Sequence, residues 1–340
     1  MTFFSIYKTL FYLFLNLSLI FFLLKFKNKI NLNDHPGKRK IHKKKIPLFG
    51  GLIISICFFA ILQIEVFKLF EIEKIISYSI IFLLIGLIDD FKNLNFQNKL
   101  VMLTLILIIV YNDISFNGLG YYEYIGNLDF GNLKFLINII FFLFLINAFN
   151  YSDGVDGNAI LLFISSMLLI GIFSNFSTDE INYFIFLLCL ILLPILIFNL
   201  NLIKNYQFFL GNNGSYMLGF VLSAILIFVA KMHILHPIIL AWSITIITYD
   251  CIDVTLRRLI NKKSIFNGDN IHLHHIFYKK FGHKQTSFYI FFLNIFIAVF
   301  GFATYKFVNA IFSLIIFIIG FIVFYQIKSF FLKKLKIFSK

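Results

Sequence analysis

Eleven long apolar runs dominate this 340-residue chain and limit what it can fold into. A helix needs about 20 apolar residues to cross the hydrocarbon core of a bilayer. Since 60% of the residues are hydrophobic and only 14% are charged, a soluble domain would have too little polar surface to cover its core. We therefore expect an all-α polytopic membrane protein with about 11 transmembrane helices in a single domain, residues 1–340. The runs lie at about 3–24, 48–70, 74–88, 100–116, 134–149, 159–176, 181–200, 216–235, 237–252, 286–304 and 309–331.

The basic residues between these runs are unevenly distributed. If the loop 25–47 is cytoplasmic and the later segments alternate, the inner segments hold 24 of the 30 Lys and Arg residues. Loops rich in Lys and Arg stay on the cytoplasmic side of a membrane. The bias predicts an outer N-terminus and a cytoplasmic C-terminus. The other inner segments are 89–99, 150–158, 201–215, 253–285 and 328–340.

Every unusual polar motif falls in one of these inner segments or directly beside it, on the cytoplasmic side. The first loop carries Arg39, Lys40 and His42. The third run ends in Asp89 and Asp90, two adjacent carboxylates that need a cation or solvent nearby. Mg²⁺ would suit them because it prefers carboxylate oxygens and retains waters for substrate phosphates. A solvated helix end is the alternative explanation for this pair.

The segment 147–157 is the most specific motif, because it places Asn150, Asp153 and Asp156 in a stretch otherwise rich in Phe and Leu. Its glycines, Gly154 and Gly157, allow a positive φ and a close backbone approach to a ligand. A polar loop that merely ends the helix is the alternative.

Two further segments point to phosphate binding. The glycine-rich turn 211–215 leads into an apolar run, and a helix N-terminus can hold a phosphate. The second segment combines arginines, which bind phosphate in a planar fork, with histidines, which donate to phosphate oxygens. Zinc binding by the histidines is an alternative, as is simple helix capping by Ser215 for the first segment. The residues of the second segment are Asp250, Arg257, Arg258, His272, His274 and His275.

Together these motifs resemble those of the polyprenyl-phosphate N-acetylhexosamine-1-phosphate transferases of the MraY, WecA and TagO types. The stretch D-H-P-G-K-R-K-I-H at 34–42 is similar to the D-x-P-x-x-R-K-x-H pattern of the WecA/TagO branch. N-A-F-N-Y-S-D-G-V-D-G-N-A at 147–159 resembles N-x-x-N-x-x-D-G-x-D-G-L-A, with Asn158 in place of Leu. The arginine pair followed by H-L-H-H also resembles that branch. The resemblance covers about residues 30–285.

The resemblance implies a reaction and its partners. A polyprenyl phosphate, here undecaprenyl phosphate, would attack the β-phosphate of a UDP-N-acetylhexosamine, most simply UDP-GlcNAc, and release UMP. The product would start cell-envelope polysaccharide synthesis at the bacterial inner (plasma) membrane, with the active site facing the cytoplasm. Mg²⁺ is the implied cofactor, and Mn²⁺ could replace it. We expect a lipid bilayer as surroundings and no nucleic-acid partner, and leave open whether the chain forms a homodimer.

Residue roles follow motif by motif from the resemblance. The implied catalytic and metal-binding residues are Asp89, Asp90, Asp153 and Asp156. The implied substrate-binding residues are Arg39, Lys40, His42, Asn150, Asp250, Arg257, Arg258, His272, His274 and His275. The family typically reads F-[ML]-G-D-x-G-S at the motif found here at 209–215, where this chain has Asn212. Asn offers a neutral oxygen, so we expect a weakened metal ligand.

Two other functions fit a membrane protein of this composition. An intramembrane prenyltransferase would use two Asp-rich motifs with acids about four residues apart, but no acid follows Asp90 at 92–94. A secondary transporter would place ionisable residues near the middle of the membrane, whereas these acids lie at helix ends.

Overall fold

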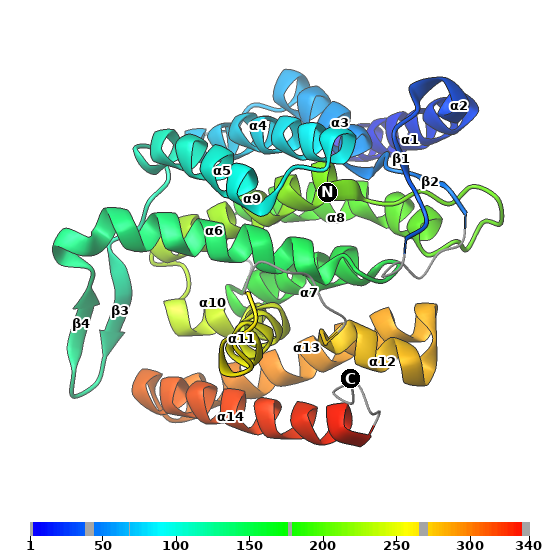
Figure 1. Ribbon diagram of the computed structural model, residues 1–340. Coiled ribbons are helices and arrows are strands. Elements are labelled where there is room, and N and C mark those ends of the chain that lie inside the picture. The colour runs from blue at the N-terminus through cyan, green and yellow to red at the C-terminus, as the bar shows by residue number, and fades with distance from the viewer. Residues whose placement is uncertain (1–2, 38–43, 68, 176–178, 265–270, 335–340) are drawn as a thin grey trace.

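The computed structural model describes residues 3–37, 44–67, 69–175, 179–264 and 271–334. Helices account for most of them (Figure 1). Their bounds are α1 Phe3–Lys25, α2 Lys27–Ile30, α3 Gly50–Ile64, α4 Phe70–Lys92, α5 Phe96–Tyr111, α6 Lys134–Ser152, α7 Asn158–Phe173, α8 Asp179–Asn199, α9 Gly211–Lys231, α10 Pro237–Ser243, α11 Thr245–Ile260, α12 Leu273–Phe281, α13 His283–Phe307 and α14 Ala310–Lys334.

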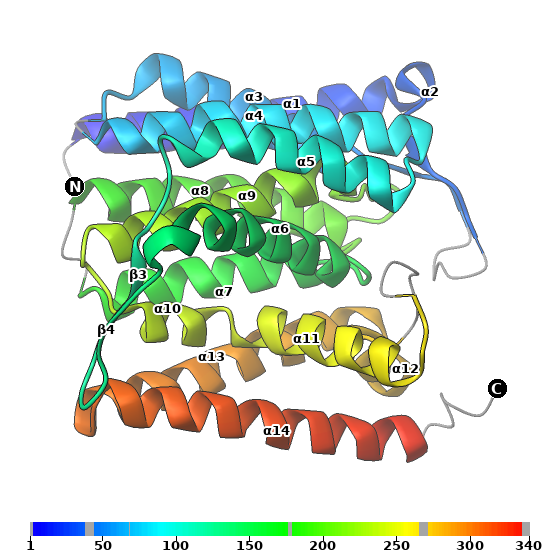
Figure 2. The same ribbon diagram turned by 60° about the vertical axis from the view of Figure 1, so that its left-hand side comes forward.

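The long helices form a bundle in which α9 is the central element. α1 to α5 lie together on one side, α6 to α9 form the middle, and α11 to α14 lie on the other side (Figures 1 and 2). The apolar 18-residue window of α9 is 94% buried, whereas that of α14 is only 11% buried. α9 packs against α3, α4 and α6, so it joins the outer layer to the middle of the bundle.

Each of the eleven apolar runs predicted from the sequence coincides with a helix, or with a bent pair of helices. Within the described residues, α1, α6, α8, α9, α13 and α14 are long and apolar enough to cross a membrane, and α10 with α11 makes a pair bent by 78°. α3, α5 and α7 have only 15 or 16 residues, or about 24 Å of helix, which is short for a bilayer core of about 30 Å. A polytopic helical protein is confirmed, and the count of eleven crossings stays a prediction.

Two short antiparallel hairpins depart from an all-helical chain. β1 (Asn33–Asp34) pairs with β2 (Ile46–Pro47), and β3 (Gly118–Tyr122) pairs with β4 (Gly126–Asp129). A short 3-10 helix, Gly131–Leu133, follows the second hairpin. Both hairpins join helices outside the apolar runs, where hydropathy gives no signal, so the sequence analysis missed them.

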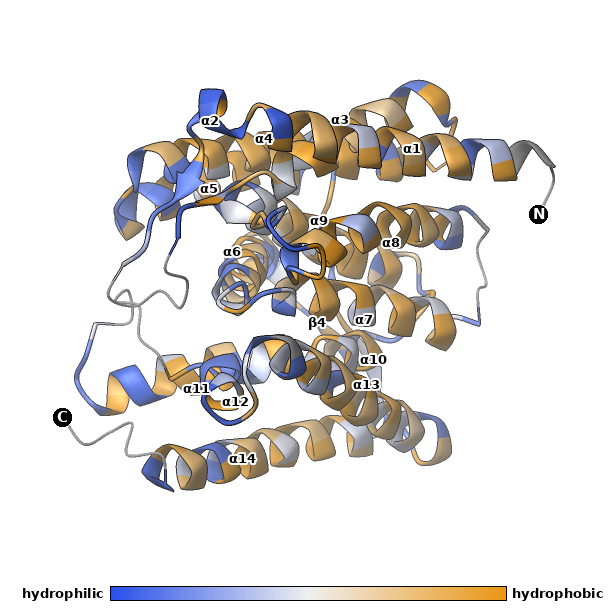
Figure 3. Cartoon of the chain, turned by 90° about the vertical axis from the view of Figure 1, so that its right-hand side faces the viewer, coloured by the Kyte–Doolittle hydropathy of each residue, from blue (hydrophilic) through white to orange (hydrophobic). Residues whose placement is uncertain are grey.

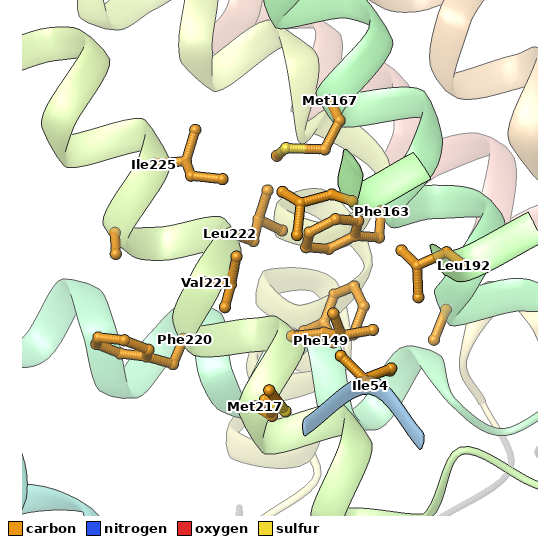
Figure 4. Packing of buried hydrophobic residues seen from close by; sticks show 14 of the residues in the cluster. Ile54, Phe149, Phe163, Met167, Leu192, Met217, Phe220, Val221, Leu222 and Ile225 are labelled. Carbon is orange, nitrogen blue, oxygen red and sulfur yellow. The ribbon is translucent and has the colours of Figure 1, made fainter. Parts of the chain in front are cut away.

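Aromatic packing holds the middle of the bundle together. Phe220 of α9 stacks on Phe82 of α4 with ring centroids 4.3 Å apart, and on Phe142 of α6 at 5.7 Å. Figure 4 shows Phe149 and Phe163 on the other side of α9, where their rings meet edge to face at 6.1 Å. Such pairs are worth about 0.5–1.5 kcal/mol beyond the area they bury.

The two ends of the bundle differ in polarity. α1 begins at the end opposite to that at which α14 ends, as an odd number of crossings requires (Figure 2). Hydrophilic residues are concentrated where α14 ends, around α2, the β1–β2 hairpin and α12, while the helices between are mainly apolar (Figure 3). We call this polar end of the bundle the motif end, because the described motifs gather there.

Candidate active site

Five helix termini meet at the motif end and bring distant motifs together. α4 and α6 end here, α9 begins here, and α11 ends beside the start of α12. α3 and α4 approach the start of α9 closely because each meets it through a glycine. A Cβ on Gly51 would lie 2.1 Å from Asn213 Oδ1, and a Cβ on Gly86 would lie 2.3 Å from Asn213 Cα. Only glycine lets α3 and α4 approach the start of α9 so closely.

Asp90 binds the N-terminus of α9. Its Oδ1 accepts the backbone N–H of Asn212 at 3.0 Å, and its Oδ2 accepts the backbone N–H of Asn213 at 3.0 Å. The Asn213 side chain donates to Asp90 Oδ2 as well, at 2.5 Å. A carboxylate at this position satisfies unpaired N–H groups and the positive end of the helix dipole. Asp90 therefore fixes the geometry of the 211–215 turn.

Asp89 is buried and its two oxygens are already engaged. Oδ1 accepts the backbone N–H of Leu94 at 3.0 Å. Oδ2 pairs with Lys99 at 2.7 Å and accepts the Tyr216 hydroxyl at 3.0 Å. These bonds join α4 to α5 and α9, so Asp89 stabilises the packing of the helices that carry the site. The sequence analysis counted Lys99 as a charge but assigned it no role.

Asn212 is oriented by a second asparagine. Asn150 Nδ2 at the end of α6 donates to Asn212 Oδ1 at 2.9 Å and to Ser215 Oγ at 2.7 Å. The motif at 147–157 and the motif at 209–215 are thus in direct contact, which agrees with the expectation that both lie on the same side of the membrane.

The turn between α6 and α7 is built by its own polar residues. Asn158, the departure from the family pattern, donates from Nδ2 to the Ser152 carbonyl at 2.8 Å and so closes the turn. Gly157 has a φ of +74°. Asp156 Oδ2 accepts Gln207 Nε2 at 2.9 Å and lies 3.6 Å from His283 Nδ1, so its charge is partly balanced.

Asp153 stands out at the tip of this turn. In the described part of the chain, its carboxylate accepts no hydrogen bond and forms no ion pair. Loss of solvation, followed by the charges of Asp156, Asp90 and Asp34, raises the pKa of Asp153 well above its usual range. Four carboxylates therefore share one electrostatic environment. Asp34 belongs to the first-loop motif, but the sequence analysis gave it no role.

The histidine segment 272–275 lies against this turn. Asp250 of α11 binds His272 through Oδ2 and Nδ1 at 2.8 Å, and it also accepts the Leu273 backbone N–H at 2.8 Å. The His272 and His274 rings stack at 5.4 Å. A Cβ on Gly154 would lie 2.2 Å from His274 Nε2, so the turn and the histidine segment touch directly.

The environments of His274 and His272 favour ligand binding. His274 Nε2 is buried without a hydrogen-bond partner. Burial, with the neighbouring His275 and His272, lowers the pKa of His274 well below its usual range. A small cavity runs between the turn and the segment, lined among others by Tyr151, Asn158 and His274.

The two arginines differ in their surroundings. The Arg257 guanidinium binds Asp253 through Nε at 2.9 Å and reaches the Tyr325 carbonyl and Ser329 of α14 at 2.9 and 2.8 Å. These bonds engage Arg257 in the contact between α11 and α14. Arg258 lies 6.0 Å from the Tyr151 ring centroid and is 3% exposed, which places it beside the histidine segment. Arg39, Lys40, His42 and Asp269 lie outside the described residues.

The residues present fit a magnesium ion that is held together with its substrate. No group of three His, Cys, Asp or Glu side chains in the described segments is already arranged around a metal position. Mg²⁺ does not require one, because it usually binds through one or two carboxylates together with waters and substrate phosphates. The unpaired Asp153, close to three other carboxylates, is the donor that such a cation would neutralise.

Comparison with known proteins agrees with this geometry. The model of glycosyl transferase family 4 matches residues 72–230. An undecaprenyl-phosphate α-N-acetylglucosaminyl 1-phosphate transferase of Escherichia coli strain K12 is 28% identical over 266 residues, which cover 76% of this chain and 72% of that protein. Enzymes of the same name from Thermotoga maritima and Yersinia pestis are 28% and 27% identical, covering 77% and 78% of this chain and 78% and 75% of their own lengths. The chain is therefore similar to these glycosyl-1-phosphate transferases over about three quarters of its length.

The motifs of the chain lie both inside and outside the region that matches the model of family 4. Residues 72–230 include Asp89, Asp90, the 147–157 segment and the 211–215 turn. The histidine segment lies beyond it, and the structure is what brings that segment against Gly154.

Proposed function

We propose that this protein transfers GlcNAc-1-phosphate from UDP-GlcNAc to undecaprenyl phosphate, releasing UMP. One observation carries the proposal: an unpaired carboxylate, Asp153, lies between a helix N-terminus and a histidine segment in a chain that is similar to glycosyl-1-phosphate transferases. In the reaction, a phosphate oxygen of the lipid forms a bond to the β-phosphorus of the donor. The bond from that phosphorus to the bridging oxygen breaks, and UMP leaves with the electron pair.

The protein's contribution is mainly to position and neutralise phosphates. Phosphoryl transfer depends on alignment and on stabilising the charge that spreads over the phosphoryl oxygens. His272, His274 and Arg258 supply donors on one side of the site. Asn150 and Asp90 hold the 211–215 turn rigid on the other side. The site is therefore preorganised before substrate enters.

We assign the metal position to Asp153, Asp156 and the Asn212 side chain, with Mg²⁺ as the expected ion and Mn²⁺ as a substitute. A metal ion held by these residues would supply positive charge that offsets the charge of the donor's phosphates. Asp90 contributes its charge to the same environment but keeps its oxygens on the α9 backbone.

We place the motif end in the cytoplasm of a bacterial cell, at the inner membrane. This assignment is supported by the 24 Lys and Arg residues of the inner segments, since UDP-sugars are cytoplasmic charged donors and basic loops stay inside. The lipid substrate would enter from the apolar sides of the bundle, which Figure 3 shows as mainly hydrophobic.

A transfer assay tests the proposal directly. Membranes containing the protein are incubated with UDP-GlcNAc labelled in the sugar, undecaprenyl phosphate, and either Mg²⁺ or a chelator. We expect label in the lipid fraction and stoichiometric UMP, both abolished by the chelator and by the Asp153→Asn variant. UDP-GalNAc in a parallel reaction measures donor selectivity.

Other outcomes of this assay identify other functions. Neither UMP nor labelled lipid, in a preparation where the Escherichia coli relative is active, would overturn the proposal. Release of pyrophosphate from a prenyl diphosphate would instead indicate a prenyltransferase. Unmodified labelled donor accumulating inside vesicles would indicate a transporter.

A further inference from the structure

A buried lysine lies on the most exposed long helix of the bundle. Lys328 of α14 is 2% exposed, although only 11% of the apolar window of that helix is buried. Burying an ammonium group in or near a bilayer is costly unless acids compensate it, and such a residue is usually functional. α14 lies outside the region matched by the family model, and no motif above includes Lys328.

Lys328 joins two acids of α11. Its Nζ lies 2.6 Å from Asp250 Oδ1 and 2.6 Å from Asp253 Oδ2. Asp253 already has a cation, because Arg257 binds both of its oxygens at 2.9 Å. Asp250 has no arginine partner in the described part of the chain, so Lys328 supplies its cation.

Asp250 connects this lysine to the active site. The oxygen that pairs with Lys328, Oδ1, also accepts the Leu273 backbone N–H at 2.8 Å, and Oδ2 binds His272 Nδ1 at 2.8 Å. One carboxylate therefore fixes both the first turn of α12 and the orientation of the His272 ring. A contact at Nδ1 determines which ring nitrogen is left for a ligand, here Nε2.

We propose that Lys328 is a positioning residue that locks the histidine segment through Asp250. This inference rests on the proposed function, in which the histidine segment holds the donor's pyrophosphate. With Lys328 present, Asp250 is a compensated charge whose two oxygens have fixed directions. Without it, Asp250 would be a buried, poorly compensated carboxylate that turns toward water and releases Leu273 and His272. α14 thus acts on the site without touching it.

The test compares Lys328→Met with Lys328→Arg and with Lys333→Met. Lys333 is an exposed residue of the same helix and serves as the matched control. We expect Lys328→Met to raise the KM for UDP-GlcNAc by about tenfold, on the scale of small misplacements of a binding group, and to leave the KM for undecaprenyl phosphate unchanged. Lys328→Arg should restore most of the loss, and Lys333→Met should behave as wild type.

Hydrogen exchange provides a measurement that does not depend on catalysis. The Leu273 amide, which Asp250 holds, should exchange faster in Lys328→Met and at the wild-type rate in Lys333→Met. If the wild-type protein shows no transfer but the Leu273 amide exchanges faster only in Lys328→Met, the proposed function fails and the positioning role of Lys328 is retained. If the wild-type protein is active and Lys328→Met matches it in both KM and Leu273 exchange, the positioning role of Lys328 is rejected.

A double variant separates positioning from charge balance. Lys328→Met leaves one excess negative charge in the buried network, which could impair folding by itself. Lys328→Met with Asp253→Asn removes that excess but leaves Asp250 without Lys328. We expect fast Leu273 exchange and a high KM in this variant too. Recovery of both to wild-type values would show that Lys328 only balances charge and would reject the proposal.

Discussion

At the scale of residues, the site depends on which carboxylates are already satisfied. Asp89 and Asp90 accept hydrogen bonds from fixed protein groups, so they shape the site. Asp153 has no such donor and is surrounded by like charges. An unpaired charge with restricted solvation costs stability until a cation arrives. The adjacent pair at 89–90, although prominent in the sequence, is thus less available to a metal than Asp153 is.

Asp153→Asn should stabilise the metal-free protein and remove its response to metal. The substitution deletes a charge that Asp156, Asp90 and Asp34 repel, so we expect a gain of roughly 1–3 kcal/mol in unfolding free energy, the scale of an unsatisfied polar group whose solvation is restricted. Thermal unfolding in detergent, with Mg²⁺ and with chelator, measures both effects. An Mg²⁺-induced rise in Tm as large in the variant as in wild type would contradict this assignment.

Asn212→Asp should strengthen metal binding and retain or raise transfer activity. Asn150 Nδ2 would still donate to the new carboxylate, which adds a charged oxygen where Asn offers a neutral one. We expect the Mg²⁺ concentration for half-maximal activity to fall by about tenfold, or 1.4 kcal/mol. A loss of metal-dependent activity in Asn212→Asp would count against the assignment of position 212 as a metal ligand.

The neighbouring asparagine provides the matched control. Asn213 donates from Nδ2 to Asp90 and to the Leu48 carbonyl, and its own Oδ1 is buried. Asn213→Asp would place a carboxylate against Asp90, so it should lower Tm with or without Mg²⁺. Equal behaviour of the two variants would mean that position 212 has no specific relation to the metal.

At the scale of elements, the site is a set of helix ends held at short distances by glycines. α9 can begin against α3 and α4 because Gly51 and Gly86 lack side chains. The α6–α7 turn can meet α12 for the same reason, at Gly154. Each of these contacts joins segments that are far apart in sequence.

Gly154→Ala should displace His274, because the added methyl would lie 2.2 Å from His274 Nε2, which is closer than an ordinary van der Waals contact allows. We expect a loss of about 1–3 kcal/mol in stability, typical of overpacking, together with a large fall in transfer rate. His274→Ala in the same chain should restore Tm by removing the clash but should not restore activity. If the double variant stays as unstable as Gly154→Ala, another contact is responsible.

At the scale of the whole molecule, the two ends of the bundle have different roles. The motif end gathers the acids and histidines of the sequence motifs, while the opposite end carries the β3–β4 hairpin between α5 and α6. Glu123 of this hairpin accepts the Ile311 backbone N–H at the start of α14, so the hairpin ties the first and last layers together.

Reporter fusions should find these ends on opposite sides of the membrane. Alkaline phosphatase inserted at Tyr124, in the hairpin turn, should be active, because the proposed orientation places that end outside. A fluorescent protein fused after Lys340 should fluoresce, because the proposed orientation places the end of α14 in the cytoplasm. An active phosphatase after Lys340 would reverse the orientation and with it the cytoplasmic site.

Much of this protein follows from its sequence alone. Long apolar runs predict helices because a chain in a bilayer must pair its backbone N–H and C=O groups internally. All eleven runs accordingly coincide with helical segments. The clustering of motifs at one end also follows, since alternation of the runs determines which loops share a side. The polar segment 147–157 could be singled out because its residues are costly in apolar surroundings.

Only the tertiary structure decided which of these residues are available for chemistry. Hydropathy carries no information on hydrogen-bond partners, so it could not show that Asp90 caps α9, that Arg257 turns to α14, or that Asp153 is left unpaired. It also missed Lys328, which in the sequence is one more basic residue near a helix end. Burial and pairing arise from contacts between distant segments, and a local pattern cannot encode them.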